Sequence, residues 1–290
     1  MQEITSPKEM RAWSRAERAR GRRVGVVPTM GFLHEGHLQL VDRAKQRADR
    51  VVLSAFVNPL QFGPREDFAN YPRDAARDRG LAQGRGVDCL FVPDQAAIYP
   101  EEPLVRVSPG PMADTLEGAP RPGHFVGVLT VVAKLFHLVE PDIAVFGRKD
   151  FQQAMLVRRM AADLDFALEI EIAPTVRELD GLALSSRNSY LQGDDRRTAL
   201  ALSRALRAVE QAWRGGEADP AALARRGLDV LRVPGVTPDY LALVDERLRP
   251  VGRADARTVV VVAARVGATR LIDNVVLGEG IGNDIVVRGS

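Results

Sequence analysis

The sequence predicts an α/β fold, with a parallel sheet that carries helices on both faces and a smaller α+β domain after it. Before residue 175, short apolar runs alternate with segments of helical periodicity. The runs are mainly apolar, which is typical of strands buried on both faces. After residue 175, two long Ala/Arg/Leu segments precede three strand-like runs. We therefore predict a Rossmann-like domain over residues 1–175 and a smaller C-terminal α+β domain over residues 176–290.

The strands and helices of the first domain can be placed in order along the chain. Strand-like runs lie at 24–27, 51–56, 87–92, 142–146 and 168–173. Helical spacing of apolar residues marks 37–49, and 150–164 begins with an Asp150/Gln153 pair that suits a helix start. Residues 124–139 are apolar nearly all round, which predicts a buried helix. Ligands of such sheets bind beyond the carboxyl ends of the strands, and we expect the functional site there.

The second domain is expected to combine two helices with a small sheet. Helical patterns over 195–214 and 221–232 are separated by the break GGEADP at 215–220. Strand-like runs follow at 239–245, 258–266 and 270–277. This order of two helices and then three strands is typical of an α+β unit.

Composition and charge argue against several classes of function. No apolar run approaches the roughly 18 residues that a membrane span needs, and the charged N-terminus lacks the apolar core of a signal peptide. The 40 basic residues nearly balance the 38 acidic ones, and the sequence has no long basic run with interleaved aromatic residues. The single cysteine, Cys89, lies in an apolar segment, which favours a small buried hydrophobe over a catalytic thiol. We expect a cytoplasmic protein that binds neither membranes nor nucleic acid.

Two of the four histidines, His34 and His37, fall three residues apart around Gly36, just after the first strand-like run. Gly31 lets the chain turn, and Gly36 lets backbone come close where the helix begins. A helix N-terminus after a strand is a ready anion site, because its unpaired N–H groups and its dipole favour phosphate. For this H-x-G-H pair we favour phosphate binding over a packing role. Metal binding is less attractive, because no nearby Cys or carboxylate completes a ligand set at the usual spacing.

The H-x-G-H signature resembles the nucleotidyltransferase superfamily, and further motifs narrow the resemblance. These are PTMGFLHEGH (28–37), FVNPLQF (56–62), NYPR (70–73), LEGAPRPGHFVGVLTVV (116–132), VFGRKDFQQ (145–153) and TVRELDGLALSSRNSYL (175–191). In this order they look like the pantothenate synthetase family, the pantoate–β-alanine ligases, and GATRLIDN (267–274) extends the similarity into the second domain. The resemblance implies an ATP-dependent condensation of pantoate with β-alanine through a pantoyl adenylate, with release of pyrophosphate and AMP.

The resemblance also assigns roles to individual positions. It implies that His34 and His37 face the ATP triphosphate, and that His37, His34 and Lys149 are the catalytic residues. The implied ATP site consists of Met30, Gly31, His34, Gly36, His37, Gly147, Lys149, Asp150, Val176, Leu184, Ser185, Ser186 and Arg187. The implied pantoate site consists of Pro28, Thr29, Met30, Gln61 and Gln153, and Gln61 is also the implied β-alanine contact. A homodimer, with the second domain as a lid, is implied as well.

Several of these positions have a plain structural alternative. Lys149 can be a solvated charge, Gln153 can belong to a helix capping box, and residues 185–187 can form a polar turn. In favour of the functional role, an amide such as that of Gln153 can donate to a carboxylate and accept from a hydroxyl, and pantoate carries both groups. The sequence departs from the family pattern at Leu184, usually Met, and at Arg148, usually Glu, whose side chain we expect to point away from the site.

The implied chemistry needs positioning and charge neutralisation rather than a general base, because the attacking carboxylate is already ionised at neutral pH. Mg²⁺ is expected to be held mainly by the ATP phosphates, with Asp78 as a candidate for organising it, and the sequence shows no protein metal cage. Glu117, Tyr71 and Arg121 match family positions near the dimer contact or the site entrance. Two alternatives stay open: another H-x-G-H enzyme, such as a cofactor adenylyltransferase, and a nucleotide-binding regulator without catalysis.

Overall fold

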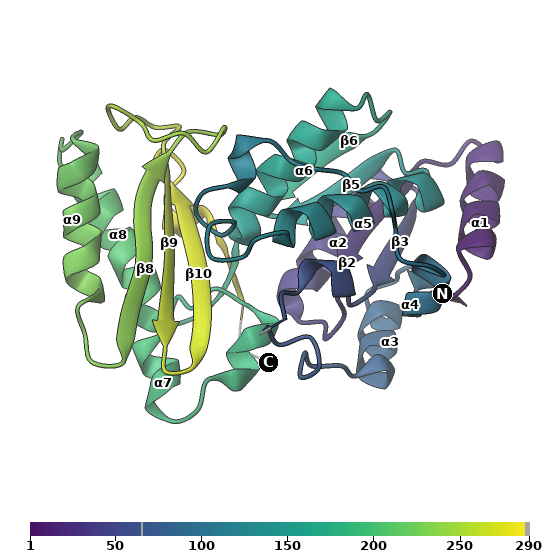
Figure 1. Ribbon diagram of the computed structural model, residues 1–290, viewed down its shortest axis with the longest axis horizontal. Helices are drawn as coiled ribbons and strands as arrows, with labels where there is room; N and C mark the ends of the chain where they lie inside the picture. Colours follow the sequence, from purple (N-terminus) through teal and green to yellow (C-terminus); the bar gives the residue numbers. More distant parts are fainter. Residues whose placement is uncertain (65, 288–290) are drawn as a thin grey trace. The chain divides into compact units, whose positions relative to one another are not determined.

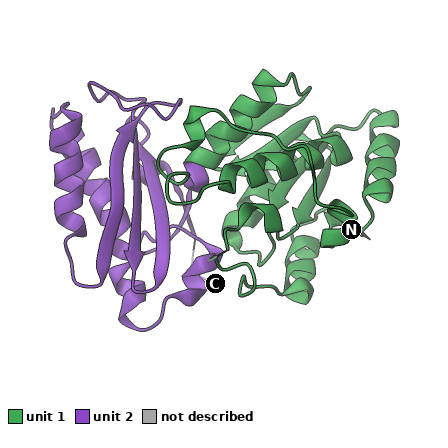
Figure 2. Ribbon diagram, viewed as in Figure 1, with its two compact units in different colours: residues 1–147, 152–173 green, residues 148–151, 174–290 purple. Residues whose placement is uncertain are grey.

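The computed structural model describes residues 1–64 and 66–287. The chain folds into two compact units, which Figure 2 colours separately: residues 1–147 with 152–173, and residues 148–151 with 174–290. The second unit therefore includes the short segment 148–151, although the chain on either side of it belongs to the first unit. No sequence pattern indicated that residues 148–151 belong to the second unit.

The first unit is built on a six-stranded sheet with the strand order β1-β4-β3-β2-β5-β6 (Figure 1). All five pairings between neighbouring strands are parallel. The strands are β1 (Gln2–Ile4), β2 (Val24–Thr29), β3 (Arg50–Ala55), β4 (Cys89–Phe91), β5 (Ile143–Gly147) and β6 (Glu169–Ala173). From β2 the chain adds strands outward in one direction and then returns to place β5 on the other side of β2. The predicted parallel sheet is confirmed, and its topological switch point lies between β2 and β5.

The helices of this part of the chain are α1 (Pro7–Ala19), α2 (Glu35–Arg47), α3 (Ala75–Gly84), α4 (Gln95–Ile98), α5 (His124–Val139) and α6 (Phe151–Asp163). Short 3₁₀ turns form at η1 (Pro59–Gln61), η2 (Pro111–Ala113) and η3 (Arg148–Asp150). The predicted helices 37–49, 124–139 and 150–164 are confirmed as α2, α5 and α6, with ends that differ by at most two residues. Among the residues that the structure describes, no helix combines the length and apolarity needed to cross a bilayer.

Helices cover both faces of the parallel sheet, as its apolar strands require. Val27 of β2 and Val145 of β5 belong to one core cluster with Val41 of α2. Phe146 points to the opposite face from Val145 because side chains alternate along a strand, and its ring lies 6.5 Å from that of Phe136 in α5, centroid to centroid. The α2 helix and the α5 helix therefore pack on opposite faces, next to the switch point.

The second unit contains an antiparallel sheet of order β10-β9-β8 and a two-stranded parallel ribbon of β11 and β7. The strands are β7 (Val176–Glu178), β8 (Val236–Val244), β9 (Val259–Val266), β10 (Thr269–Val276) and β11 (Ile285–Val287). The helices are α7 (Asp194–Thr198), α8 (Leu200–Arg214) and α9 (Pro220–Leu231), with 3₁₀ turns η4 (Ser186–Tyr190) and η5 (Ile281–Asn283). The predicted α+β architecture is confirmed, but the expected helix 195–214 is interrupted at Ala199. There the Leu202 N–H bonds the Ala199 carbonyl, a step of three residues that breaks the α-helical ladder.

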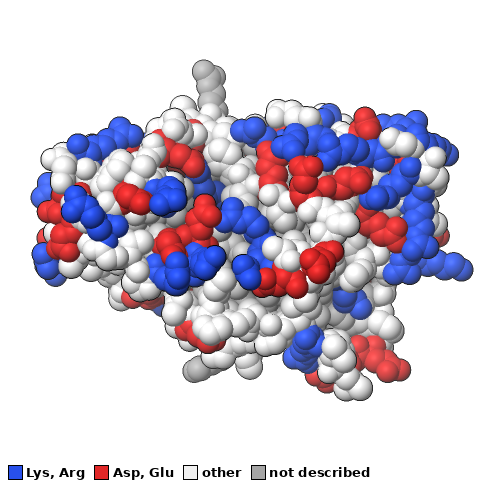
Figure 3. Space-filling view, turned by 90° about the horizontal axis from the view of Figure 1, so that it is seen from above, with Lys and Arg blue, Asp and Glu red and all other residues white. Residues whose placement is uncertain are grey.

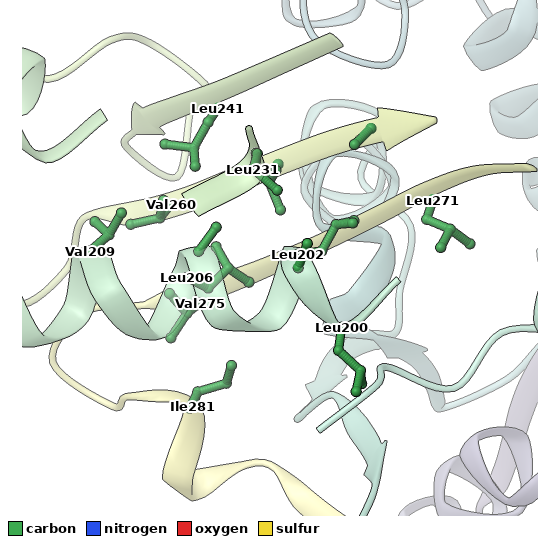
Figure 4. Close-up of a cluster of buried hydrophobic side chains, with 14 of the residues drawn as sticks. Leu200, Leu202, Leu206, Val209, Leu231, Leu241, Val260, Leu271, Val275 and Ile281 are labelled. Atoms are coloured by element: carbon green, nitrogen blue, oxygen red, sulfur yellow. The ribbon is translucent and has the colours of Figure 1, made fainter. Parts of the chain in front are cut away.

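The core of the second unit lies between its helices and the antiparallel sheet. Figure 4 shows Leu202, Leu206 and Val209 along one side of α8, in the same buried cluster as Val260 of β9 and Val275 of β10. The spacing of four and three between the helical residues is that of one helix face. This packing gives the second unit a hydrophobic core of its own.

The surface carries charges of both signs. Figure 3 shows acidic and basic side chains interspersed over the face in view, in keeping with the near balance of 40 basic and 38 acidic residues. Many arginines are paired with carboxylates, as in the contacts of Arg15 with Glu140 at 2.7 Å and Arg79 with Glu3 at 2.5 Å.

Candidate functional site

The carboxyl end of β2 leads into a loop whose shape is fixed by hydrogen bonds. The Thr29 hydroxyl donates to the Ser54 carbonyl at 2.7 Å and accepts from the Gly31 N–H at 3.1 Å. Gly31 has φ +77°, a conformation that a glycine adopts without steric cost. The predicted residues Pro28, Thr29 and Met30 therefore end β2 in a defined turn at the switch point.

Asp78 of α3 holds the next part of this loop. Its two carboxylate oxygens accept from the backbone N–H groups of Phe32 and Leu33, both at 2.7 Å. Asp78 is 5% exposed, and burial raises the pKa of its carboxyl although the two backbone hydrogen bonds act in the opposite direction. Both oxygens of this candidate magnesium partner thus serve as a loop anchor.

His34 and His37 come together where α2 begins. Their rings stack with centroids 4.0 Å apart and planes inclined by 29°. The His34 N–H donates to Nδ1 of His37 at 3.3 Å, so Nε2 of a neutral His37 ring carries the proton. Gly36 lies between them in the first turn of α2. The predicted pair therefore adds an imidazole N–H donor to the positive end of a helix dipole.

Gln61 of η1 lies beside Met30 and is 8% exposed. Its amide nitrogen contacts the Met30 sulfur at 3.0 Å, and its amide oxygen accepts from Nδ2 of Asn58 at 3.1 Å. Nδ2 of Asn58 also donates to the Gly127 carbonyl at 3.1 Å, and Oδ1 of Asn58 accepts from the Tyr99 hydroxyl at 3.1 Å. These bonds fix the orientation of the Asn58 amide. They consequently turn the N–H groups of Gln61 away from Asn58.

A glycine in α5 allows η1 to approach this closely. A Cβ atom on Gly127 would lie 2.2 Å from the carbonyl oxygen of Leu60, so no side chain fits there. The sequence did not identify this Asn58 network. The position of Asn58 inside the FVNPLQF motif was the available signal.

His124, the first residue of α5, anchors the backbone of Gln61. Its Nδ1 donates to the Gln61 carbonyl at 2.8 Å, and its Nε2 accepts from Arg121 at 2.9 Å. Burial, followed by the charge of Arg121, lowers the pKa of His124 to about 4, so the ring is neutral at physiological pH. Arg121 also pairs with Glu66 at 2.6 Å. Burial acts to raise the pKa of Glu66, but the hydrogen bonds and charge of Arg121 lower it.

The two glutamines at the start of α6 have different environments. Gln152 is buried, accepts from the Glu117 N–H at 2.9 Å, and donates to the carbonyls of Met112 and Thr115 at 2.8 and 2.9 Å. It therefore ties a loop to the helix. Gln153, the predicted pantoate contact, is partly exposed.

The second unit gathers the other predicted nucleotide residues. The Leu184 N–H bonds the Val176 carbonyl at 2.9 Å, so the chain just before the SSRN segment (185–188) runs alongside β7. Ser185 caps η4, where its hydroxyl accepts from the Arg187 N–H at 3.3 Å. Ser186 is the first residue of η4. Leu184 thus lies beside Val176 of β7, and the chain continues directly from it through Ser185 into η4, which contains Ser186 and Arg187.

Lys149 and Asp150 lie in η3 and belong to the same second unit. The Lys149 ammonium lies 3.9 Å from the Asp150 carboxylate, and the lysine side chain is 18% exposed. Gly147, just before this turn, ends β5 in the first unit. Most of the predicted site residues therefore lie either in the segment from the end of β2 to the start of α2, with Gln61 beside Met30, or in the second unit. Gly147 and Gln153 lie elsewhere in the first unit, in β5 and α6.

Comparison with known proteins decides the family. The sequence model of the pantoate-beta-alanine ligase family matches residues 2–276. The chain belongs to this family. A pantothenate synthetase of Pelotomaculum thermopropionicum is 49% identical over 273 residues, which cover 93% of this chain and 97% of that protein.

Solved structures of the pantoate-beta-alanine ligase family show the same fold. The crystal structure of pantothenate synthetase from Thermus thermophilus has a TM-score of 0.90 and 49% identity, with 96% of this chain and 99% of that chain covered. The pantoate-beta-alanine ligase of Francisella tularensis has a TM-score of 0.81 and 32% identity, with 97% and 99% covered. These comparisons confirm the predicted fold class and the assignment to this enzyme family.

Two further observations bear on the chemistry. Cys89 is buried, and this burial raises the pKa of its thiol to about 12, as expected of a core residue rather than a nucleophile. Within residues 1–64 and 66–287, no group of three or more His, Cys, Asp or Glu side chains is placed to hold a metal ion.

Proposed function

We propose that this pantoate-beta-alanine ligase family member condenses pantoate with β-alanine in two steps that consume ATP. The pantoate carboxylate attacks the α-phosphorus of ATP, which forms pantoyl adenylate and releases pyrophosphate. The amine of β-alanine then attacks the acyl carbon, which forms the amide bond of pantothenate and releases AMP. The Francisella tularensis relative, whose structure is described as complexed with β,γ-ATP and β-alanine, supports both substrates.

The histidine pair at the start of α2 carries this proposal. An imidazole donor from His37, the neighbouring ring of His34 and the helix N-terminus converge where a parallel sheet binds its ligand. Such donors stabilise negative charge that builds on the phosphates during displacement. The main-chain atoms of Met30, Gly31 and Gly36 in the same loop and first turn are proposed to border the nucleotide.

In the second unit we propose nucleotide binding through the lysine turn and the SSRN segment. Lys149 and Arg187 supply positive charge, and Ser185 and Ser186 supply hydroxyl donors to phosphate oxygens. The backbone of Gly147, Val176 and Leu184 and the carboxylate of Asp150 are assigned to the adenosine. These assignments follow the family motifs.

Pantoate is assigned to the end of β2, with Pro28, Thr29, Met30, Gln61 and Gln153. Because Asn58 donates to the amide oxygen of Gln61 and one amide N–H of Gln61 contacts the Met30 sulfur, we propose that the second N–H meets the ligand, and it suits a carboxylate. We propose the same amide as a β-alanine contact. A carboxylate nucleophile that is already ionised then needs only alignment with the α-phosphorus.

The proposal also covers the metal ion, the oligomeric state and the location of the enzyme. We propose that Mg²⁺ arrives on the ATP phosphates, because both oxygens of Asp78 already bind backbone N–H groups. By resemblance to the family, we propose a homodimer in the cytoplasm.

Product analysis tests the proposed function. Purified protein given ATP, pantoate and β-alanine should form pantothenate, AMP and pyrophosphate in equal amounts, as measured by chromatography with phosphorus NMR. Formation of ADP, or of a product that keeps the nucleotide, would contradict it. The second outcome would favour an adenylyltransferase.

A further inference from the structure

The turn that carries Lys149 is fixed to the second unit by one buried amide. Nδ2 of Asn274, in β10, donates to the carbonyl of Arg148 at 2.9 Å and to the carbonyl of Lys149 at 3.0 Å. Asn274 is 2% exposed, so water does not compete for these bonds. Two successive carbonyls of a three-residue turn are thus held by a single side chain.

The same turn is held a second time through the side chain of Arg148. Arg148 is 8% exposed, and its guanidinium pairs with Asp284 at 3.0 Å and with Glu279. From the sequence we expected the Arg148 side chain to point away from the site, and it is buried beside carboxylates of its own unit. Arg148, the residue before Lys149, therefore anchors the turn both through its side chain and through its backbone carbonyl.

These two anchors belong to one closed ring of interactions. Asp284 also accepts from Arg177 at 2.6 Å, and Arg177 in turn pairs with both oxygens of Asp273 at 2.6 and 2.8 Å. Asp273 accepts from the backbone N–H of Asn274 at 2.8 Å, and the Asn274 side chain returns to the carbonyl of Arg148. Every member contacts the next, and all of them belong to the second unit.

The ring is held together by buried charge. Arg177 is 1% exposed, and Asp273 and Asp284 are 4% and 8% exposed. Burial alone would lower the pKa of Arg177, but the two carboxylates raise it above its ordinary value. Removing one charged partner would leave a buried charge without compensation, so the charged members depend on one another. A ring of this kind specifies one backbone geometry.

We infer that this ring is a positioning device for Lys149, and that Asn274 is the residue through which it acts. The inference rests on the proposed role of Lys149 as a phosphate-binding cation. A lysine side chain has four rotatable bonds, so its ammonium can meet a phosphate in a defined place only if its backbone is held. Asn274 touches no substrate in this scheme and acts through the main chain of Lys149.

A double-mutant cycle separates positioning from simple support of the fold. Asn274→Ala should lower the turnover of pantoate-dependent pyrophosphate exchange on the order of 10- to 100-fold, the scale of a small misplacement of a reacting group. The KM for pantoate should not change. In a Lys149→Ala background, Asn274→Ala should cause no further loss, because its effect passes through the missing ammonium. Multiplied losses in the double variant would overturn the inference while leaving the proposed role of Lys149 intact.

Further variants test the rest of the ring. Asp284→Asn should reproduce the selective loss of exchange turnover, and Arg148→Lys, which keeps the charge, should cause a smaller loss. Asp239→Asn is the matched control, because it removes an ion pair with Arg270 at 2.6 Å in the same unit but outside the ring. It should leave exchange unchanged.

Three other results would overturn the positioning role. If Lys149→Ala itself leaves exchange unchanged, the proposed role of Lys149 fails, and the positioning role fails with it. If even Arg148→Lys prevents folding, the ring is a folding element and the positioning role is overturned. Equal losses in pyrophosphate exchange and in amide formation from supplied pantoyl adenylate would overturn it too.

Discussion

Replacing Asp78 with Asn should separate two roles for this carboxylate, a loop anchor and a magnesium ligand. In the structure, two oxygens accept from two backbone N–H groups at 2.7 Å. An asparagine side chain in this place would keep one acceptor and turn its NH₂ group toward the other N–H. A hydrogen bond to a charged group contributes roughly 1.5–3 kcal/mol. Relief of the buried charge offsets part of this loss, so we expect the free energy of unfolding to fall by about 2 kcal/mol.

Urea unfolding measures this change, with Asp42→Asn as the control. Asp42 is partly exposed and pairs with Arg85 at 2.8 Å, and loss of such a surface pair typically costs at most about 1 kcal/mol. In Asp78→Asn the turnover of pyrophosphate exchange should also fall, because the loop before His34 loosens, while the Mg²⁺ concentration for half-maximal activity should stay the same. Unchanged stability together with a raised Mg²⁺ requirement would refute the anchor role.

Three other predictions follow from the site. Gln61→Ala should raise the KM for pantoate far more than that for ATP, by the roughly 1–3 kcal/mol of a lost buried partner; equal effects on both would make Gln61 a support of the fold. His37→Ala and Lys149→Ala should each lower adenylation turnover on the order of 10²–10³. Both should recover much of the amide-forming rate with supplied pantoyl adenylate, with the larger remaining deficit in His37→Ala. Lys149→Ala should shift stability within about 0.5 kcal/mol, and His37→Ala, which loses the hydrogen bond from the His34 N–H, should lower it by about 1 kcal/mol. Early unfolding or equal loss of both half-reactions would assign these two residues to the scaffold. His124 has a folded pKa of about 4, below its ordinary value of 6.5, so its contribution to stability is present above pH 6.5 and should be lost, by about 3 kcal/mol, as the pH falls toward 4. His124→Gln should flatten that part of the pH profile of unfolding, and an unchanged profile would show that His124 is not responsible.

The sequence predicted the parts of this molecule that depend on local pattern. The nearly all-round apolar character of residues 124–139 placed both ends of α5 correctly, and the H-x-G-H spacing placed His34 and His37 together at the start of α2. The three-residue strands β1, β7 and β11 escaped notice, because so short a run has no period to detect.

Long-range contacts account for most of what the sequence did not predict. Asp78 lies 45 residues from the backbone N–H of Leu33 that it binds, and Arg148 lies 136 residues from Asp284. Nothing in the local composition of either segment identifies the partner. The transfer of residues 148–151 to the second unit depends on the same distant carboxylates and on Asn274, so no pattern around GRKD could have indicated it.

Exchange of labelled pyrophosphate into ATP tests the central claim most directly, because it reports the first proposed step alone. The purified protein should catalyse this exchange when pantoate is present and β-alanine is absent, and omission of pantoate should abolish it. Exchange that proceeds without pantoate, or that responds instead to a nucleotide or a phosphopantetheine precursor, would contradict the account and indicate an adenylyltransferase.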